Sequence, residues 1–186
     1  YREFRNLIIK KYKKNKNKTF FFNSISLIYL LIFIFIGYDL YKFSPLYLLF
    51  ILSICIFSDS GGYLVGNLIG GKRLTKISPN KTISGSIGSF IFSIFPLLII
   101  LILSDNYNLP ELLINNILNN IFYIIFGCLF LSLICQLGDL FISYFKRKAK
   151  LKDTGSLLPG HGGLLDRIDG LIFVLPVAYL LKLILI

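Results

Sequence analysis

Long apolar runs separated by short polar segments make up most of this chain. The first run, from about Thr19 to Ile36, would rise about 27 Å as a helix, enough to cross a hydrocarbon core of about 30 Å. A second helix is predicted from Pro45, which suits a first helical turn, and it stays apolar through Phe57. Three further runs follow, at about 83–103, 117–142 and 171–186. The pattern predicts an all-α polytopic membrane protein with about five transmembrane helices.

The polar segments between these runs differ in charge. Basic residues gather in three blocks, at 10–18, 72–81 and 146–152. The other two segments, predicted as loops at 37–44 and 104–116, contain Lys42 as their only basic residue. Because Lys and Arg stay on the cytoplasmic side of a membrane, we expect the three basic blocks, with their polar loops, at the cytoplasmic face. Residues 1–18 would then be a basic juxtamembrane segment and 19–186 a single membrane domain.

Composition supports the membrane interpretation. Of the 186 residues, 55% are hydrophobic and only 16% are charged, whereas soluble domains are nearer a quarter charged. A net charge of +11 would also suit nucleic acid, but the basic residues stand beside hydrophobic spans, so no nucleic-acid partner is expected. Cys55, Cys128 and Cys135 lie inside apolar runs without paired metal-ligand spacing, so we expect them to pack as small hydrophobic residues.

The candidate chemistry lies at the end of the run 117–142 and beyond it. Four polar residues spaced i, i+4, i+7 and i+8 share one face of a continuing helix: Asp139, Ser143, Lys146 and Arg147. A carboxylate, a hydroxyl and two cations in one row suit a metal-bound polyphosphate, with Asp139 on the metal and the cations on phosphate oxygens. Taken alone, the basic run 146–152 is more typical of a membrane edge.

A glycine-rich loop follows, containing Gly155, Gly160, Gly162 and Gly163 around the single histidine, His161. Glycine lets the backbone approach a ligand closely and present amide groups to phosphate oxygens. A lone histidine is usually structural, but these flanking glycines leave it little to pack against, which favours a functional role.

Three further aspartates are candidates for ligand contact. Asp166 and Asp169 are three residues apart at the start of the last helix, so both carboxylates would point to one side of it. Paired carboxylates bind Mg²⁺, although acidic residues near a helix N-terminus also complement the macrodipole, and the two interpretations are about even. Asp59 ends an apolar helix and is followed by small residues, so we expect it to face a polar cavity or a ligand.

The segment from Ser143 to Asp169 reads S-x-F-K-R-x4-K-D-x-G-x2-L-P-G-H-G-G-x2-D-R-x-D without a gap. It closely resembles the signature of the phosphatidate cytidylyltransferase (CDP-diacylglycerol synthase) family. Gly138-Asp139 and the block Asp59–Gly85, which contains Gly70-Gly71-Lys72 and Ser78-Pro79-Asn80-Lys81-Thr82, are similar to that family too. The chain departs from the family's pattern at Ser84, where an acidic residue is common, and at Gly170, where serine is common.

The resemblance implies a membrane enzyme that condenses CTP with phosphatidic acid, giving CDP-diacylglycerol and pyrophosphate, with Mg²⁺ as cofactor. A second, monovalent cation and assembly into a homo-oligomer stay open. The implied metal ligands are Asp139, Asp166 and Asp169. The implied catalytic and phosphate-contacting residues are Asp139, Lys146, Arg147, Lys152, Asp153, His161 and Arg167. The implied substrate-binding residues are Ser143, Gly160, Gly162, Gly163, Asp59, Lys72, Ser78, Lys81 and Thr82.

Members of that family usually have more than five spans, so we expect the chain to be the C-terminal part of a longer protein, with 19–186 as its membrane catalytic domain. The active site is expected at the cytoplasmic face, in the endoplasmic reticulum for a eukaryotic chain. Two other classes stay open. A related CTP-using enzyme, such as a polyprenol kinase or an ether-lipid cytidylyltransferase, would change the acceptor lipid. A membrane transporter would also bury aspartates, but it would not need the glycine-histidine loop.

Overall fold

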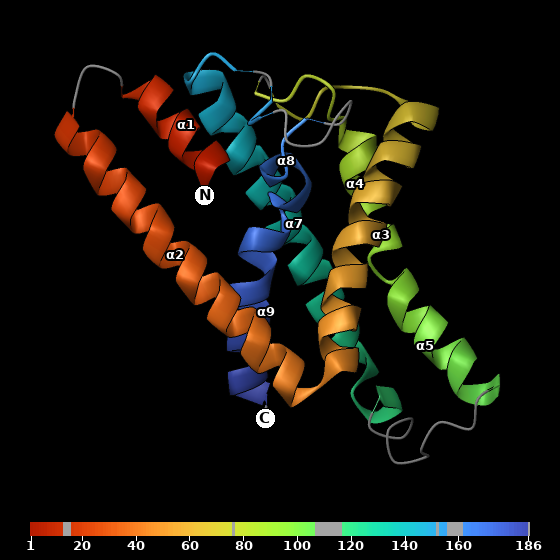
Figure 1. Ribbon diagram of the computed structural model, residues 1–186. Coiled ribbons are helices and arrows are strands. Elements are labelled where there is room, and N and C mark those ends of the chain that lie inside the picture. The colour runs from red at the N-terminus through yellow and green to blue at the C-terminus, as the bar shows by residue number, and fades with distance from the viewer. Residues whose placement is uncertain (13–15, 76, 107–116, 152, 156–161, 186) are drawn as a thin grey trace.

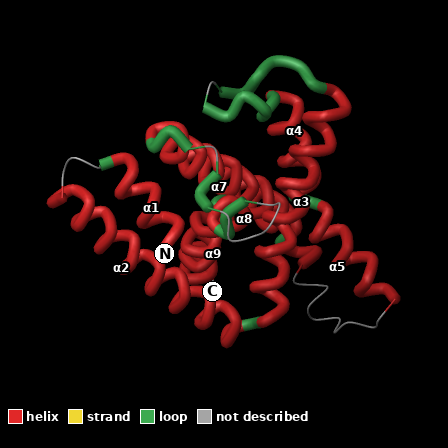
Figure 2. Tube along the Cα trace, turned by 45° about the horizontal axis from the view of Figure 1, so that its top comes forward, coloured by secondary structure: helices red, strands yellow, loops and turns green. Residues whose placement is uncertain are grey.

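The computed structural model describes residues 1–12, 16–75, 77–106, 117–151, 153–155 and 162–185. Within these ranges the chain forms helices and loops without a β-strand, so the predicted all-α class is confirmed (Figures 1 and 2). The helices are α1 Arg2–Lys11, α2 Lys16–Phe43, α3 Pro45–Ile69, α4 Ile83–Phe92, α5 Phe95–Asn106, α7 Ile121–Lys148, α8 Leu165–Ile168 and α9 Leu171–Leu185.

Four of the described helical segments are long and apolar enough to cross a membrane: Lys16–Phe43, Pro45–Ile69, Ile83–Leu103 and Ile121–Lys148. They correspond in order to the first four predicted spans. The fifth predicted span becomes α9, which at 15 residues is about 22 Å long and shorter than the hydrocarbon core. Large apolar side chains cover the outside; Leu68 and Phe122 are each 83% exposed. The chain is an integral membrane protein.

The predicted loop at 37–44 is wrong, because α2 continues through it to Phe43. Leu40 is completely buried in the core, so this stretch gains packing by staying helical. The break falls at Ser44, whose hydroxyl accepts a hydrogen bond from the Tyr47 N–H at 3.3 Å and caps α3. Pro45 occupies the first turn of α3, as the sequence predicts.

The predicted span 83–103 is interrupted between α4 and α5. Pro96 explains the break: it has no N–H to donate, and its ring crowds the carbonyl of the residue four positions earlier, Phe92. Ser93, at the end of α4, donates its hydroxyl to the carbonyl of Phe90 at 2.7 Å. The span therefore consists of two helices that change direction near residue 94 (Figure 1).

Helices α3 and α4 pack with their backbones close together, because glycines face one another. A Cβ atom at Gly85 would lie 2.7 Å from the carbonyl oxygen of Gly62. One at Gly88 would lie 2.5 Å from the Cβ of Val65. The small residues at the start of the third span thus permit the close helix approach that the sequence predicts. This approach fixes the loop 70–82, which joins the two helices.

The apolar core is formed by α2, α3, α7 and α9. Its buried members are Ile36, Leu40, Ile51, Ile54, Cys55, Cys128, Leu131, Cys135, Val174, Leu175 and Ala178. All three cysteines are buried and free, which confirms their predicted packing role.

The two ends of the helices differ in charge, in agreement with the sequence pattern. One end gathers α1, the loop 70–82, the C-terminal end of α7, and α8 (Figure 1). The opposite end holds the junction of α2 and α3 and the end of α9. There Lys182 forms an ion pair with Asp39 at 2.9 Å and lies over the ring of Phe43. The basic blocks and the candidate site therefore share one end.

A proline inside α9 is accommodated by a side chain from α2. Pro176 cannot donate to the carbonyl of Ile172, four residues earlier, which would leave that oxygen without its helical partner. The hydroxyl of Tyr29 donates to the Ile172 carbonyl at 2.7 Å. Since an unsatisfied carbonyl is costly in lipid, this bond stabilises the α2–α9 contact.

We predict that Tyr29→Phe lowers the free energy of unfolding by about 1 kcal/mol, because the Ile172 carbonyl then has no donor. In a Pro176→Ala background the new Ala N–H can bond to that carbonyl, so Tyr29→Phe should cost almost nothing. Thermal unfolding in detergent, followed by a thiol-reactive dye that labels the three buried cysteines, measures both effects. An equal loss in both backgrounds would refute the explanation.

Candidate active site

The C-terminal half of α7 presents a polar face. The hydroxyl of Ser143 donates to Oδ1 of Asp139 at 3.3 Å. One turn later, Nζ of Lys146 donates to Oδ1 of Asp166 at 2.8 Å. The spacing of Asp139, Ser143 and Lys146 predicts that they share one helix face, and these contacts agree with that prediction.

Asp166 is engaged on both carboxylate oxygens. While Oδ1 accepts from Lys146, Oδ2 accepts from the N–H of Thr154 at 2.9 Å, from its hydroxyl at 3.0 Å, and from the N–H of Gly163 at 3.0 Å. Burial by itself would raise the pKa of Asp166, but the Lys146 ammonium and the two backbone N–H groups outweigh it and lower the pKa. In this arrangement Asp166 joins α7, the segment 153–155 and α8.

Asp169 lies beside Asp139. It is 8% exposed, its Oδ1 accepts from the Gly170 N–H at 2.9 Å, and its carboxyl hydrogen-bonds with that of Asp139. Burial and the neighbouring Asp139 carboxylate raise the pKa of Asp169 to about 8. The spacing of Asp166 and Asp169 predicts a pair of carboxylates at the start of the last helix. The structure instead places them on the short helix α8 and its cap, each with a different partner on α7.

Two glycines allow α7 and the start of α9 to lie close together, which brings Asp169 beside Asp139. A Cβ atom at Gly138 would lie 2.7 Å from the ring of Phe173 and 3.1 Å from the carbonyl oxygen of Asp169. A Cβ atom at Gly170 would lie 2.5 Å from the sulfur of Cys135 and 3.0 Å from its carbonyl oxygen. Any larger side chain at either position would push Asp169 away from Asp139.

The loop 70–82 contributes a positively charged side chain to the region around Asp139. Lys81 forms an ion pair with Oδ2 of Asp139. The loop is held by an isolated antiparallel bridge between Arg73 and Thr82 and by the Leu74 N–H, which donates to the Lys81 carbonyl at 2.7 Å. The hydroxyl of Thr82 caps α4 by accepting from the Gly85 N–H at 3.1 Å.

Asp59 on α3 completes the acidic cluster. It accepts a hydrogen bond from the Cys135 thiol at 3.7 Å and lies within the electrostatic reach of Asp139 and Lys81. The sequence predicts that Asp59 faces a polar cavity or a ligand; in the structure it lies near the charged groups of Asp139 and Lys81, and the cavity or ligand stays a prediction. Three helices and one loop thus contribute charge to one small region.

Two of the remaining predicted residues make contacts with or within the loop 70–82. Arg147 donates to the carbonyl of Ile77 at 3.4 Å, which joins the end of α7 to the loop 70–82. The backbone carbonyl of Ser78 accepts from the Lys81 N–H at 3.1 Å and so closes the turn before Lys81. Lys72, Asp153 and Arg167 are exposed, and Gly162 has a positive φ of 84°. Lys152, Gly160 and His161 lie outside the described residues.

Comparison with known proteins identifies the family. A model of the cytidylyltransferase family matches residues 3–185. The chain belongs to this family.

Three relatives illustrate the similarity, and each is named phosphatidate cytidylyltransferase. The chain is 41% identical over 136 residues to the protein of Staphylococcus haemolyticus. It is 42% identical over 137 residues to that of Staphylococcus saprophyticus, and 43% over 138 residues to that of Staphylococcus aureus. Each match covers 73% of this chain and 48% of the relative, so the chain spans about half the length of the curated relatives it matches.

The residues of this cytidylyltransferase-family site fit a magnesium ion in part. Asp139 and Asp169 offer adjacent carboxylate oxygens, the ligands that Mg²⁺ prefers. Within the described ranges no three His, Cys, Asp or Glu side chains converge as a metal-binding group. A Mg²⁺ ion held here would take its other ligands from water and substrate phosphates, as this ion commonly does. Both carboxylate oxygens of Asp166 already accept hydrogen bonds from the protein. Its role as a third metal ligand therefore stays a prediction.

A row of hydrogen-bonded polar side chains between the helices was not predicted from the sequence. The Ser86 hydroxyl donates to Oε1 of Gln136 at 2.5 Å, and Nε2 of Gln136 donates to Ser132 at 3.4 Å. Ser132 in turn hydrogen-bonds with Ser58 at 2.8 Å, and all four side chains are wholly or partly buried. This row of hydrogen bonds joins α3, α4 and α7. Gln136, a polar residue towards the end of the apolar run 117–142, was the available signal.

We predict that Gly170→Ala lowers stability by about 1–3 kcal/mol, because the new methyl group overlaps Cys135. Gly127→Ala is the matched control: it lies in α7, nothing is within 4 Å of its Cβ position, and helix propensity favours alanine. Thermal unfolding of the two variants in detergent compares them. Equal stability of Gly170→Ala and wild type would show that α7 and α9 do not approach as described.

Proposed function

We propose that the protein containing this chain transfers the cytidylyl group of CTP to phosphatidic acid. The observation that carries the proposal is the meeting of Asp139 and Asp169, with Lys81 paired to the first of them, in a chain of the cytidylyltransferase family. A cluster of carboxylates and cations is suited to binding a metal-bound polyphosphate. The names of the staphylococcal relatives support phosphatidic acid as the acceptor.

In the proposed reaction a phosphate oxygen of the lipid attacks the α-phosphorus of CTP. A bond forms between that oxygen and the phosphorus, the bond to the β-phosphate oxygen breaks, and pyrophosphate leaves. Because the lipid phosphate is already ionised near neutral pH, the reaction does not require a strong general base. Catalysis then depends on aligning the two anionic reactants and compensating their charge.

Each charged residue has a role in this proposal. Asp139 and Asp169 would hold Mg²⁺, which when bound stabilises negative charge on the phosphates. Lys81, Lys146 and Arg167 would compensate the charge of CTP. Lys81 and Lys146 form ion pairs with aspartates in the present structure. Anionic phosphates of CTP would compete with those aspartates for the two lysines.

We further propose that this end of the protein faces the cytoplasm, where CTP is available. The three basic blocks lie at this end, and the positive-inside rule supports that orientation. The lipid phosphate would stay at the membrane surface while CTP enters from water. Assembly into a homo-oligomer and the identity of the membrane stay predictions.

The test uses CTP labelled at either the α- or the γ-phosphate, with the intact protein, Mg²⁺ and phosphatidic acid in mixed micelles. We predict that α-label enters the lipid fraction and γ-label does not. Asp169→Asn should lower the rate at least about 100-fold, a loss typical of a removed charge-stabilising group. Lys42→Gln, a charge change at the opposite end, should leave the rate unchanged.

Each of the other outcomes rejects part of the proposal. Transfer of γ-label to lipid would indicate a kinase. Transfer of α-label only to a different lipid, such as a polyprenol phosphate or an ether lipid, would reject phosphatidic acid as the acceptor. Full activity of Asp169→Asn would reject the assigned site.

A further inference from the structure

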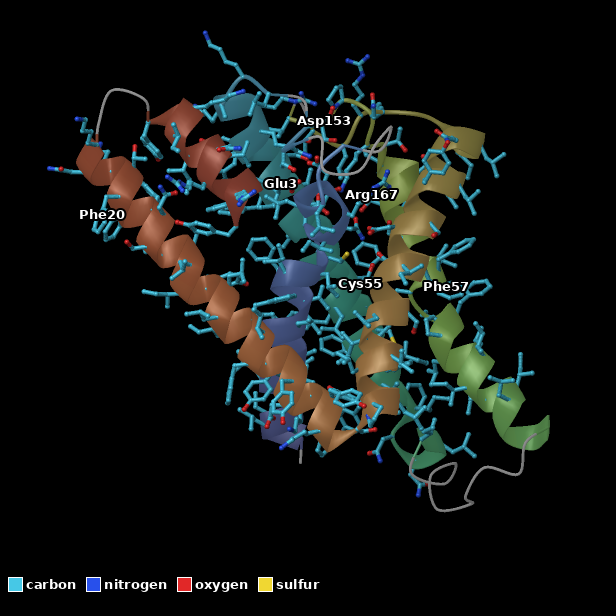
Figure 3. All side chains as sticks on the ribbon, in the orientation of Figure 1. Glu3, Phe20, Cys55, Phe57, Asp153 and Arg167 are labelled. Atoms are coloured by element: carbon cyan, nitrogen blue, oxygen red, sulfur yellow. The ribbon has the colours of Figure 1, made fainter. Side chains whose placement is uncertain are left out.

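The first helix reaches into the candidate site with its only acidic side chain. Oε1 of Glu3 accepts a hydrogen bond from the Leu164 N–H at 3.0 Å, and Oε2 accepts from the Leu165 N–H at 2.7 Å. The hydroxyl of Thr154 also donates to Oε2, at 3.3 Å. Figure 3 shows Glu3 at the end of α1 that meets α7 and α8. Glu3 therefore bridges the segment 153–155 and the start of α8.

Helix α1 is fixed firmly enough to act as a support. Leu7 and Ile8 are each 1% exposed. The ring of Phe4 lies 6.4 Å from that of Phe145 on α7, and Tyr12 stacks on Phe22 of α2 at 5.0 Å. The sequence predicts only a basic juxtamembrane segment here. The buried face of α1 instead places Glu3 at a defined position.

Two signature glycines make room for this carboxylate. A Cβ atom at Gly155 would lie 2.9 Å from Oε1 of Glu3, and its three nearest atoms would all belong to Glu3. A Cβ atom at Gly163 would lie 2.9 Å from Oε2 of Glu3. The N–H of Gly163 is donated to Asp166. In this structure these glycines therefore admit the Glu3 carboxylate and support the turn.

We propose that Glu3 is a positioning residue, and that Gly155 is required because the Glu3 carboxylate occupies the space beside it. By holding Thr154, Leu164 and Leu165, Glu3 fixes the turn from which Asp166, Arg167 and Asp169 project. The proposal adds α1 to the catalytic unit, and its kinetic part rests on the proposed function.

The test compares Glu3→Ala, Gly155→Ala and the double variant in the intact protein. A methyl group at Gly155 displaces the same carboxylate that Glu3→Ala removes, so both single variants should show the same defect and the double variant no more. We expect the KM for CTP to rise about tenfold in all three, with the KM for phosphatidic acid unchanged, because groups that contact CTP phosphates are misplaced. Arg2→Gln, an exposed charge change on α1, is the matched control and should leave both constants unchanged.

A second measurement does not depend on activity. Hydrogen–deuterium exchange of the 162–168 peptide should accelerate at least about tenfold in all three variants, since the Leu164 and Leu165 N–H groups lose their acceptor. Exchange in the middle of α7 should not change. Additive defects in the double variant, unchanged exchange, or faster exchange with an unchanged KM for CTP would each overturn the proposal. If the wild type transfers no cytidylyl group, the proposed function fails by itself, and the exchange pattern still decides whether Glu3 holds the turn.

Discussion

The candidate site depends on how closely the start of α9 approaches α7. Gly138 and Gly170 permit that approach, because each would otherwise place a Cβ atom inside a neighbouring residue. The result is that Asp169, which precedes α9, meets Asp139, in the second half of α7. The two carboxylates come from different segments, α7 and the C-terminal cap of α8. The glycine contact is therefore needed both for the packing of α7 against the start of α9 and for bringing these two carboxylates together.

Charge at this end is stabilised by partners from distant parts of the chain. Asp139 is paired with Lys81 of the loop 70–82, and Asp166 with Lys146 of α7. The close packing of α3 against α4 fixes that loop, so the position of Lys81 follows from glycines on two other helices. Because carboxylates near lipid are costly without compensation, each ion pair also fixes the element that carries it. Anionic phosphates, when bound, would replace the aspartates as the partners of Lys81 and Lys146.

Much of this arrangement follows from the sequence. Where the structure differs from the sequence-based prediction, the difference has a physical cause. Apolar run length predicted the main spans, and helical periodicity placed Asp139, Ser143 and Lys146 on one face. Periodicity alone paired Asp166 with Asp169, whereas tertiary packing gave each a separate partner on α7. Glu3 was not predicted because its partners are more than 150 residues away in the chain. A single acid in a lysine-rich segment was its only local signal.

We propose above that Asp139 and Asp169 together hold a divalent cation, and this assignment can be tested directly. Mn²⁺, used in place of Mg²⁺, can be titrated into the protein with CTP present while electron paramagnetic resonance reports the free ion. The account predicts that Asp139→Asn and Asp169→Asn each weaken Mn²⁺ binding at least about tenfold. Asp39→Asn, which removes a carboxylate at the opposite end, should bind like wild type. Unchanged Mn²⁺ affinity in both site variants would contradict the account.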